Sequence, residues 1–356
     1  MMDNRLPYLI ALTHLYDGKH RLLREVLQRY PDPEEAWGRV VLPGKAASWQ
    51  RAQQELEFVD KHHIGTCYLH EADYPERLAQ CPDAPILLYT KGNVNFRDGH
   101  FISVVGTRQA TERGKMVTRE IILSLAEQLS HLTIVSGLAY GIDIAAHRAA
   151  LEAGIPTLII PAHGLDRIYP SVHRAEAVRA LENGGIVTEY MSGSTPEKQH
   201  FVARNRIVAG LSDCTIVVES PARGGSLITA SMAFDYNRPV FAVPGRISDD
   251  TSAGCNEMIR DQRATLLQKP DDLIETMMWA TARRPVQTKL QGLTDDNLSP
   301  EEKTLLDKLR EAEDGMLVND LAEETDMTYS EIITRLMTLE MKKYVKSFPG
   351  GKFMAV

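Results

Sequence analysis

The chain has 356 residues, of which 43% are hydrophobic and 25% are charged. This length predicts two or three domains, and this composition is that of a soluble globular protein with a substantial core. The formal net charge of −8 argues against a uniformly basic nucleic-acid-binding protein. A local basic cleft remains compatible with that charge, because it can focus a positive field on an acidic protein.

The cysteines and the apolar runs indicate the compartment. The four cysteines (Cys67, Cys81, Cys214 and Cys255) are scattered and form no CxxC pair. This pattern argues for reduced thiols rather than for disulfides or a zinc site. No apolar run approaches the length of a membrane span, and residues 9–12 are too short for the core of a signal sequence. We therefore expect a cytoplasmic protein with no membrane partner.

Residues 1–70 are expected to form a small helical module. Apolar residues recur at helical spacing from Leu9 to Val59, and the pattern extends to about Cys67. Pro31-Asp32-Pro33 and Pro43-Gly44 break it into short helices. A connecting stretch follows, with one expected strand at residues 86–89.

Residues 71–275 alternate between short apolar strands and helices. The expected strands are Ile102–Val105, Thr133–Ser136, Thr157–Ile160, Ile186–Thr188, Thr215–Val218 and Val240–Val243. Helical stretches such as Met116–Leu129 lie between them. This alternation predicts an α/β fold with a doubly wound, mostly parallel, Rossmann-like sheet, whose ligand site lies at the carboxyl ends of the strands.

The remainder of the chain is expected to be a linker and a winged helix. Residues 276–298 are polar and aperiodic, as linkers are. Residues 299–356 are helical again and end in a hairpin around Pro349-Gly350-Gly351. This tail carries eight Lys or Arg against twelve Asp or Glu, a net charge of −4, and its candidate recognition helix, Tyr329–Leu339, presents Glu331 and Arg335. Because duplex DNA would be repelled, we expect the tail to contact protein or to stabilise the fold.

Three glycine-containing turns follow strands of the predicted sheet and open helices. They are Gly106-Thr107-Arg108, Ser136-Gly137 and Gly224-Gly225-Ser226. Unpaired N–H groups at such helix starts can hold phosphates. Arg108 stands where the dinucleotide-binding fingerprint has its second glycine, so we expect it to pair with a phosphate directly. The alternative is an arginine that hydrogen-bonds to loop carbonyls.

A further cationic group is Arg204-Asn205-Arg206, which precedes an apolar helical stretch. Two arginines around an asparagine near a strand end suit phosphate contact, but a buried ion pair with Glu189 or Glu219 fits the pattern equally well. Asp143 could cap a helix or tether an arginine. The chain shows no carboxylate pair, catalytic triad or metal-ligand spacing, so we expect neither catalysis nor a cofactor.

Taken in order, these motifs resemble the DNA-processing protein A family, also called Smf. The resemblance covers residues 74–267 without large gaps. The matching segments are Gly106-Thr107-Arg108, Ser136–Asp143 with His147, Gly164-Leu165-Asp166 with Tyr169-Pro170, Thr188-Glu189-Tyr190, Phe201 with Arg204-Asn205-Arg206-Ile207, Gly225–Ala230 and Val240–Gly245.

The resemblance implies a protein that binds single-stranded DNA entering the cell by natural transformation, protects it, and helps load the recombinase RecA. It also implies a homodimer formed through the central domain. Two departures stand out. His173-Arg174 replaces the family's asparagine followed by a basic residue, so Arg174 supplies the basic partner. Gln262-Arg263-Ala264 replaces its usual Gly-Ala.

Two other functions use the same features. The Gly224-Gly225-Ser226 turn is similar to that of the lysine-decarboxylase-like nucleotide phosphoribohydrolases, but those enzymes carry a glutamate soon after the glycines, and here no acid appears before Asp235. A regulatory protein that senses a small nucleotide would also need such turns. We expect a non-enzymatic single-stranded DNA-binding protein, with phosphates held at the three turns and with Arg108 and Arg174 as counter-charges.

Overall fold

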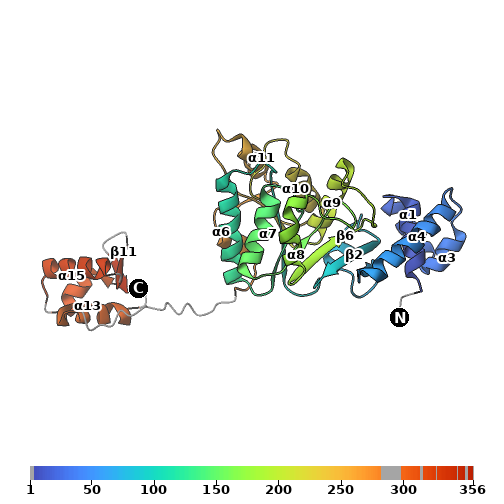
Figure 1. The fold of residues 1–356 in the computed structure, drawn as a ribbon. Helices are drawn as coiled ribbons and strands as arrows, with labels where there is room; N and C mark the ends of the chain where they lie inside the picture. The colour runs from blue at the N-terminus through green and yellow to red at the C-terminus, as the bar shows by residue number, and fades with distance from the viewer. Residues whose placement is uncertain are drawn as a thin grey trace. The chain divides into compact units, whose positions relative to one another are not determined.

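The protein divides into two compact units, Met1–Ala282 and Arg283–Val356. The computed structural model, drawn in Figure 1, describes residues 4–281, 298–312, 316–325, 327–342, 344–348 and 352–355. The expected linker over residues 276–298 falls mostly outside these ranges. Among the helices of the described part, none is both long enough and apolar enough to cross a membrane.

The N-terminal helices pack on the edge of a sheet. They are α1 (Leu6–Tyr16), α2 (His20–Arg29), α3 (Pro33–Arg39) and α4 (Lys45–Lys61). The breaks between these helices have local causes. Asp32 caps α3 by accepting the Glu34 N–H at 3.0 Å, and Gly44 is the N-cap of α4 with a left-handed φ of 85°. The helical pattern was expected to reach Cys67, but it ends earlier, because Gly65–Tyr68 forms strand β1.

The sheet of the first unit has nine strands in the order β1-β2-β6-β5-β4-β3-β7-β8-β9. Its strands are β1, β2 (Leu87–Gly92), β3 (His100–Val105), β4 (Leu132–Ser136), β5 (Thr157–Ile159), β6 (Gly184–Thr188), β7 (Cys214–Val217), β8 (Val240–Ala242) and β9 (Thr265–Leu266). The seven strands from β6 to β9 in this order are parallel, whereas β1 and β2 are antiparallel additions at one edge. The expected doubly wound, mostly parallel sheet is therefore confirmed.

Helices cover both faces of this sheet. The helices that follow the strands are α5 (Glu76–Ala79), α6 (Glu112–Gln128), α7 (Ile142–Ala153), α8 (Arg174–Ala180), α9 (Lys198–Gly210), α10 (Ser226–Asp235), α11 (Ala253–Arg260) and α12 (Pro270–Thr276). Figure 1 shows α6, α7 and α8 side by side over one face. Along β3, Ile102 and Val104 pack in the core under α6 and α7, while Phe101 and Val105 pack in the core that contains α9 and α10. Both faces of the strand are buried, which is why four of its six residues are large and apolar.

The N-terminal helices share a core with the sheet. Leu9, Leu12, Leu23 and Leu27 are buried in the same cluster as Leu78, Ile86, Leu88 and Ile207. A second cluster joins α1 and α4 to Leu87 and Tyr89 of β2. The separation of residues 1–70 from residues 71–275 as two domains remains a prediction.

The second unit is a winged helix. It consists of α13 (Pro300–Glu311), α14 (Val318–Glu324), α15 (Tyr329–Met341) and a three-stranded sheet of β10 (Met316–Leu317), β12 (Lys352–Ala355) and β11 (Val345–Phe348). Leu305, Leu321 and Leu336 come from the three helices and are fully buried in its core. Ser299 caps α13 by accepting the Glu302 N–H at 3.2 Å, with Pro300 at the first helical position.

A comparison of two leucines tests the shared core of the first unit. Leu12 in α1 is fully buried and Leu22 in α2 is half exposed. We expect Leu12→Ala to lower the free energy of unfolding by about 2–5 kcal/mol, because it leaves a cavity in that core, and Leu22→Ala by less than about 0.5 kcal/mol. Urea denaturation followed by circular dichroism measures both. Equal effects of the two substitutions would contradict this packing.

Candidate nucleic-acid interface

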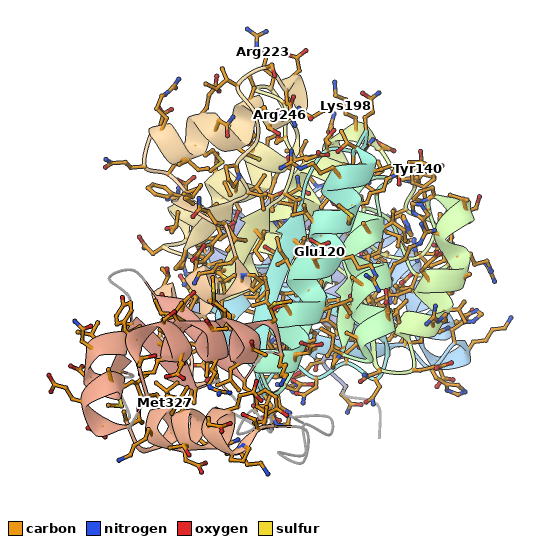
Figure 2. All side chains as sticks on the ribbon, turned by 90° about the vertical axis from the view of Figure 1, so that its left-hand side faces the viewer. Glu120, Tyr140, Lys198, Arg223, Arg246 and Met327 are labelled. Atoms are coloured by element: carbon orange, nitrogen blue, oxygen red, sulfur yellow. The ribbon has the colours of Figure 1, made fainter. Side chains whose placement is uncertain are left out.

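The glycine turns lie at one edge of the sheet, where the parallel strands end. Gly106 follows β3, Ser136 ends β4, and the segment Ser220–Gly225 follows β7. Figure 2 shows Tyr140, Lys198, Arg223 and Arg246 at the same end of this unit. The structure thus brings together segments that are far apart in the sequence, as expected for the carboxyl edge of a doubly wound sheet.

The turn after β3 requires a glycine because it is tightly packed. A Cβ at Gly106 would lie 2.4 Å from Ile142 Cγ1 and 2.9 Å from the Glu219 carbonyl oxygen. The neighbouring Thr107 N–H donates to that carbonyl at 2.7 Å, and the Ile142 N–H donates to the Thr107 carbonyl at 3.3 Å. The loop after β3 therefore holds the loop after β7 and the start of α7 together.

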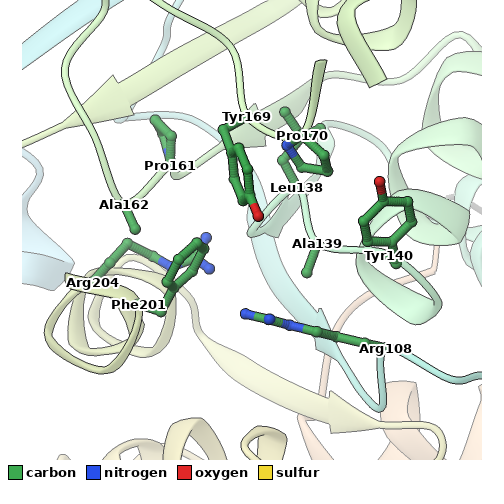
Figure 3. A pocket seen from close by; sticks show the side chains of 10 residues that line it. All are labelled: Arg108, Leu138, Ala139, Tyr140, Pro161, Ala162, Tyr169, Pro170, Phe201 and Arg204. Carbon is green, nitrogen blue, oxygen red and sulfur yellow. The ribbon is translucent and has the colours of Figure 1, made fainter. Parts of the chain in front are cut away.

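A small pocket opens beside this turn (Figure 3). It is lined by Arg108, Leu138, Ala139, Tyr140, Pro161, Ala162, Tyr169, Pro170, Phe201 and Arg204, and its free volume is about 40 Å³. The Arg108 guanidinium carbon lies 4.9 Å from the centre of the Phe201 ring, and the Tyr169 ring is tilted against Phe201 at 6.1 Å. In this state the guanidinium occupies the exposed face of the phenylalanine in a cation–π contact.

Arg204 and Asp143 form a buried pair of charges at this pocket. A Cβ at Gly137 would lie 2.3 Å from Asp143 Oδ2 and 2.5 Å from Arg204 Nη1, so only glycine fits above the pair. Arg204 is 5% exposed and donates from Nη1 to the Ile160 carbonyl, while its Nε has no hydrogen-bond partner among the described residues. Burial raises the pKa of Asp143 and lowers the pKa of Arg204, each against the attraction of the other.

Arg206 makes the buried ion pair that was one of the two alternatives for this segment. Its guanidinium pairs with Glu189, whose carboxylate also lies 3.1 Å from His20 Nε2 in α2. Burial alone would raise the pKa of Glu189, but Arg206 and His20 together hold it below its ordinary value. Arg206 therefore joins α9 to β6 and to the N-terminal helices, and Asn205 lies half-buried beside it on α9.

The hydroxyl groups of two predicted site residues are used inside the fold. Ser136 is fully buried and its Oγ donates to the Val104 carbonyl at 2.7 Å. Ser226 Oγ donates to Ser220 Oγ at 2.8 Å, and the Gly224 N–H donates to the Pro221 carbonyl at 2.9 Å. Gly225 is the N-cap of α10. These two turns can therefore offer only backbone groups to an anion.

Arg174 lies at the start of α8 and is exposed, outside the pocket lining. The histidine before it has a structural role: His173 is buried, its Nδ1 lies 2.9 Å from the Leu138 carbonyl oxygen, and its ring meets Tyr140 edge-on at 5.0 Å. His173 thus supports the pocket wall. The apolar walls Leu138, Pro161 and Ala162 were not predicted, although each lies within three residues of the end of a strand.

The fold and this site define a Rossmann-like protein with a pocket lined by arginine and aromatic side chains at the carboxyl ends of its parallel strands. Family models agree with that description: one for DNA recombination-mediator protein A matches residues 65–278, and one for the DprA winged helix domain matches residues 292–351. Protein Smf of Escherichia coli is 30% identical over 329 residues, which cover 88% of this chain and 86% of that protein. DNA processing protein DprA of Streptococcus pneumoniae is 40% identical over 202 residues, 57% of this chain and 71% of that protein.

Solved structures agree with these relatives. The structure of DNA processing protein A from Streptococcus pneumoniae matches with a TM-score of 0.66 and 33% identity over 76% of this chain and 97% of that one. The structure of DNA processing protein A from Helicobacter pylori, described as revealing a unique single-stranded DNA binding mode, matches with a TM-score of 0.54 and 30% identity over 60% of this chain and 95% of that one. The chain belongs to the DNA-processing protein A (Smf) family, as its motifs predict.

Stability measurements can distinguish the buried Arg206 from the exposed Arg108. Arg206→Ala would leave the Glu189 carboxylate buried without its main partner, so we expect the free energy of unfolding to fall by about 3–5 kcal/mol. Arg108 is exposed, and Arg108→Ala is expected to change it by less than about 0.5 kcal/mol. Urea denaturation provides the measurement. Parent-like stability of the Arg206 variant would show that the ion pair does not hold the fold.

Proposed function

We propose that this protein is a non-enzymatic single-stranded DNA-binding protein that protects incoming DNA and helps load the recombinase RecA during natural transformation. The observation that carries the proposal is the position of Arg108 over Phe201 at the mouth of the pocket. Aromatic rings beside a cationic side chain suit unpaired bases, which can stack on the rings. In a duplex the faces of the bases are covered by the neighbouring base pairs. The description of the Helicobacter pylori structure supports the same ligand class.

Binding would begin with an exchange at Phe201. The guanidinium of Arg108 leaves the ring and pairs with a phosphate, and a base takes its place on the ring. Tyr169 and Tyr140, which are about half exposed, border the same pocket and offer further apolar surface.

The phosphates would follow the carboxyl edge of the sheet. Backbone groups at Gly106-Thr107-Arg108, Ser136-Gly137 and Gly224-Gly225-Ser226 would contact them, with Arg174 as a further counter-charge. Asn205 would contribute from α9, while Arg204 and Arg206 would keep that helix in place. Contacts to phosphates carry little sequence information, so binding should be largely non-specific and sensitive to salt.

A homodimer is supported by the far edge of the sheet. Strand β9 is the last strand there, and Thr265 and Leu266 are both exposed. The adjacent cavity has a volume of about 610 Å³ and includes Phe234, which is 48% exposed, and Arg263. An open strand edge beside an exposed aromatic ring is suited to a second copy of the chain.

The structure offers no support to the phosphoribohydrolase alternative. Asp235, the first acid after the glycine turn, is the last residue of the ten-residue helix α10 and thus lies about 13 Å along the helix from its start. His147 is fully buried, with its Nδ1 2.7 Å from Thr157 Oγ1, and burial lowers its pKa to about 4. In the described part of the chain, no three His, Cys, Asp or Glu side chains group closely enough to hold a metal ion.

The acidic winged helix fits a protein partner better than duplex DNA. On α15, Arg335 is 3.4 Å from Glu301, and Lys342 just beyond the helix donates to Glu302 at 3.0 Å. The exposed face of α15 instead presents Tyr329, Met337 and Met341. Four lysines form a local basic cluster in the sequence near the hairpin: Lys342, Lys343, Lys346 and Lys352. Of these, Lys343 and the side chain of Lys346 lie outside the described residues.

Substitutions at the pocket test the DNA track. We expect Arg108→Ala and Arg174→Ala each to weaken the binding of single-stranded DNA equally for all sequences. Each should also reduce the slope of log affinity against log salt concentration by roughly 0.7 for each phosphate that is no longer neutralised. Phe201→Ala should cost about 1–3 kcal/mol of binding free energy, with recovery in Phe201→Tyr, because the first substitution removes stacking and the second restores it. Fluorescence anisotropy with labelled oligonucleotides measures each. Arg119→Ala, a surface change in the middle of α6, is the control. Parent-like DNA binding by both Arg108→Ala and Arg174→Ala would refute the proposed path of the phosphates.

Removal of the winged helix tests the role of the tail. A chain that ends at Ala282 should bind single-stranded DNA within about twofold of the full chain, because the proposed contacts all lie in the first unit and the tail is acidic. Electrophoretic mobility shift at low salt, where electrostatic binding is strongest, also measures duplex binding by the isolated tail. Saturable duplex binding that disappears when Lys342, Lys343, Lys346 and Lys352 become alanine would contradict a protein-contacting tail.

A further inference from the structure

A second cavity opens at the same sheet edge, on the other side of the turn after β3. Its volume is about 400 Å³, which is ten times the free volume of the pocket beside Phe201 and is within the range of small-molecule sites. It is lined by Thr111, Arg113, Gly114 and Val117 of α6 and its cap, by Val218 and Glu219 after β7, and by Val243, Pro244, Gly245, Arg246, Asp249, Asp250, Thr251 and Ser252 after β8.

The cavity lies at the topological switch point of the sheet. Strand β3 has β4 on one side and β7 on the other, so the chain proceeds in opposite directions from it. In open α/β sheets the crevice outside such a point is the general location of ligands. The pocket beside Phe201 uses the β4 and β5 side of this point, whereas the second cavity uses the β7 and β8 side.

The polar groups of the cavity have both signs. Arg113 and Arg246 are exposed at its rim, and the N-terminus of the seventeen-residue helix α6 begins there. Glu219 is 7% exposed, and its carboxylate accepts the Thr111 N–H at 2.9 Å and the Thr111 hydroxyl at 2.6 Å. Asp249 and Asp250 stand on the opposite wall. Three carboxylates against two arginines make a poor site for a bare anion, because the acids would repel it.

The apolar part of the lining completes the pattern. Val117, Val218, Val243 and Pro244 offer aliphatic surface between the two charged ends. A ligand that fits must therefore bring an anion for the arginines, a flat apolar body for the aliphatic surface, and hydrogen-bond donors for the acids. A nucleotide has these three parts, and carboxylates at nucleotide sites commonly accept from ribose hydroxyls.

We propose that this cavity binds a nucleoside 5′-phosphate, with the phosphate on Arg113 and Arg246, the base on the valines, and the ribose hydroxyls on Asp249 or Asp250. The nucleotide is a free ribonucleotide, because an internal unit of a DNA strand has no free ribose hydroxyl to donate to these acids. The site does not depend on the proposed DNA binding.

Calorimetric titration of the full-length protein with adenosine and guanosine 5′-monophosphate tests this site. At least one nucleotide should bind saturably and at least about tenfold more tightly than inorganic phosphate, and its 2′-deoxy form should bind more weakly. The double variant Arg113→Ala/Arg246→Ala should bind it about tenfold more weakly than the parent, since it lacks the charge-assisted hydrogen bonds to the phosphate. Arg119→Ala, on the same helix, and Arg108→Ala should bind like the parent.

The same variants separate this proposal from the proposed function. Simultaneous binding of the monophosphate and oligothymidylate is the expected result, and displacement of the monophosphate by oligothymidylate would overturn a separate site for a free nucleotide. No saturable binding by either monophosphate, or binding that is abolished in Arg108→Ala and kept in the double variant, would overturn the site. DNA binding by the parent and by the double variant, measured in parallel, reports on the proposed function separately and confirms that the variant is folded.

Discussion

The contact between the loops after β3 and β7 is the constraint on which the rest of this edge depends. The Thr107 N–H donates to the Glu219 carbonyl, and the Glu219 carboxylate in turn accepts from Thr111 at the cap of α6. Gly106 permits this approach because a side chain there would meet both Ile142 and Glu219. The loop after β3 carries Arg108 and leads directly into α6, which carries Arg113, so this contact positions both exposed arginines.

The arginines near the carboxyl ends of the strands have two roles in this acidic protein: some are buried in charge pairs and others are exposed. Arg204 and Arg206 are buried with Asp143 and Glu189 and orient α9, so their charges are balanced within the fold. Arg108, Arg113, Arg174 and Arg246 remain exposed. Because the buried charges are balanced locally, the exposed arginines determine the potential at the carboxyl edge, and a net charge of −8 does not prevent an anion-binding surface there.

The winged helix combines a fold shared with DNA-binding proteins and an acidic net charge. Its helices and hairpin follow the usual arrangement around Leu305, Leu321 and Leu336. The exposed side of α15 nevertheless presents tyrosine and methionine, and Arg335 and Lys342 are paired with Glu301 and Glu302. The function of such a module follows from the surface of its third helix rather than from its topology.

The sequence by itself determined the doubly wound sheet, the winged helix and the glycine turns, because buried parallel strands are continuously apolar and tight turns after them need glycine. The sequence did not predict strands β1 and β9, because short, partly exposed segments become strands only when a neighbouring strand supplies hydrogen bonds. Sequence left open whether Arg206 meets a phosphate or Glu189, because burial of α9 depends on helices contributed by residues far from it. The second cavity joins Thr111–Gly114 to Val243–Ser252, and only the tertiary structure brings those segments together.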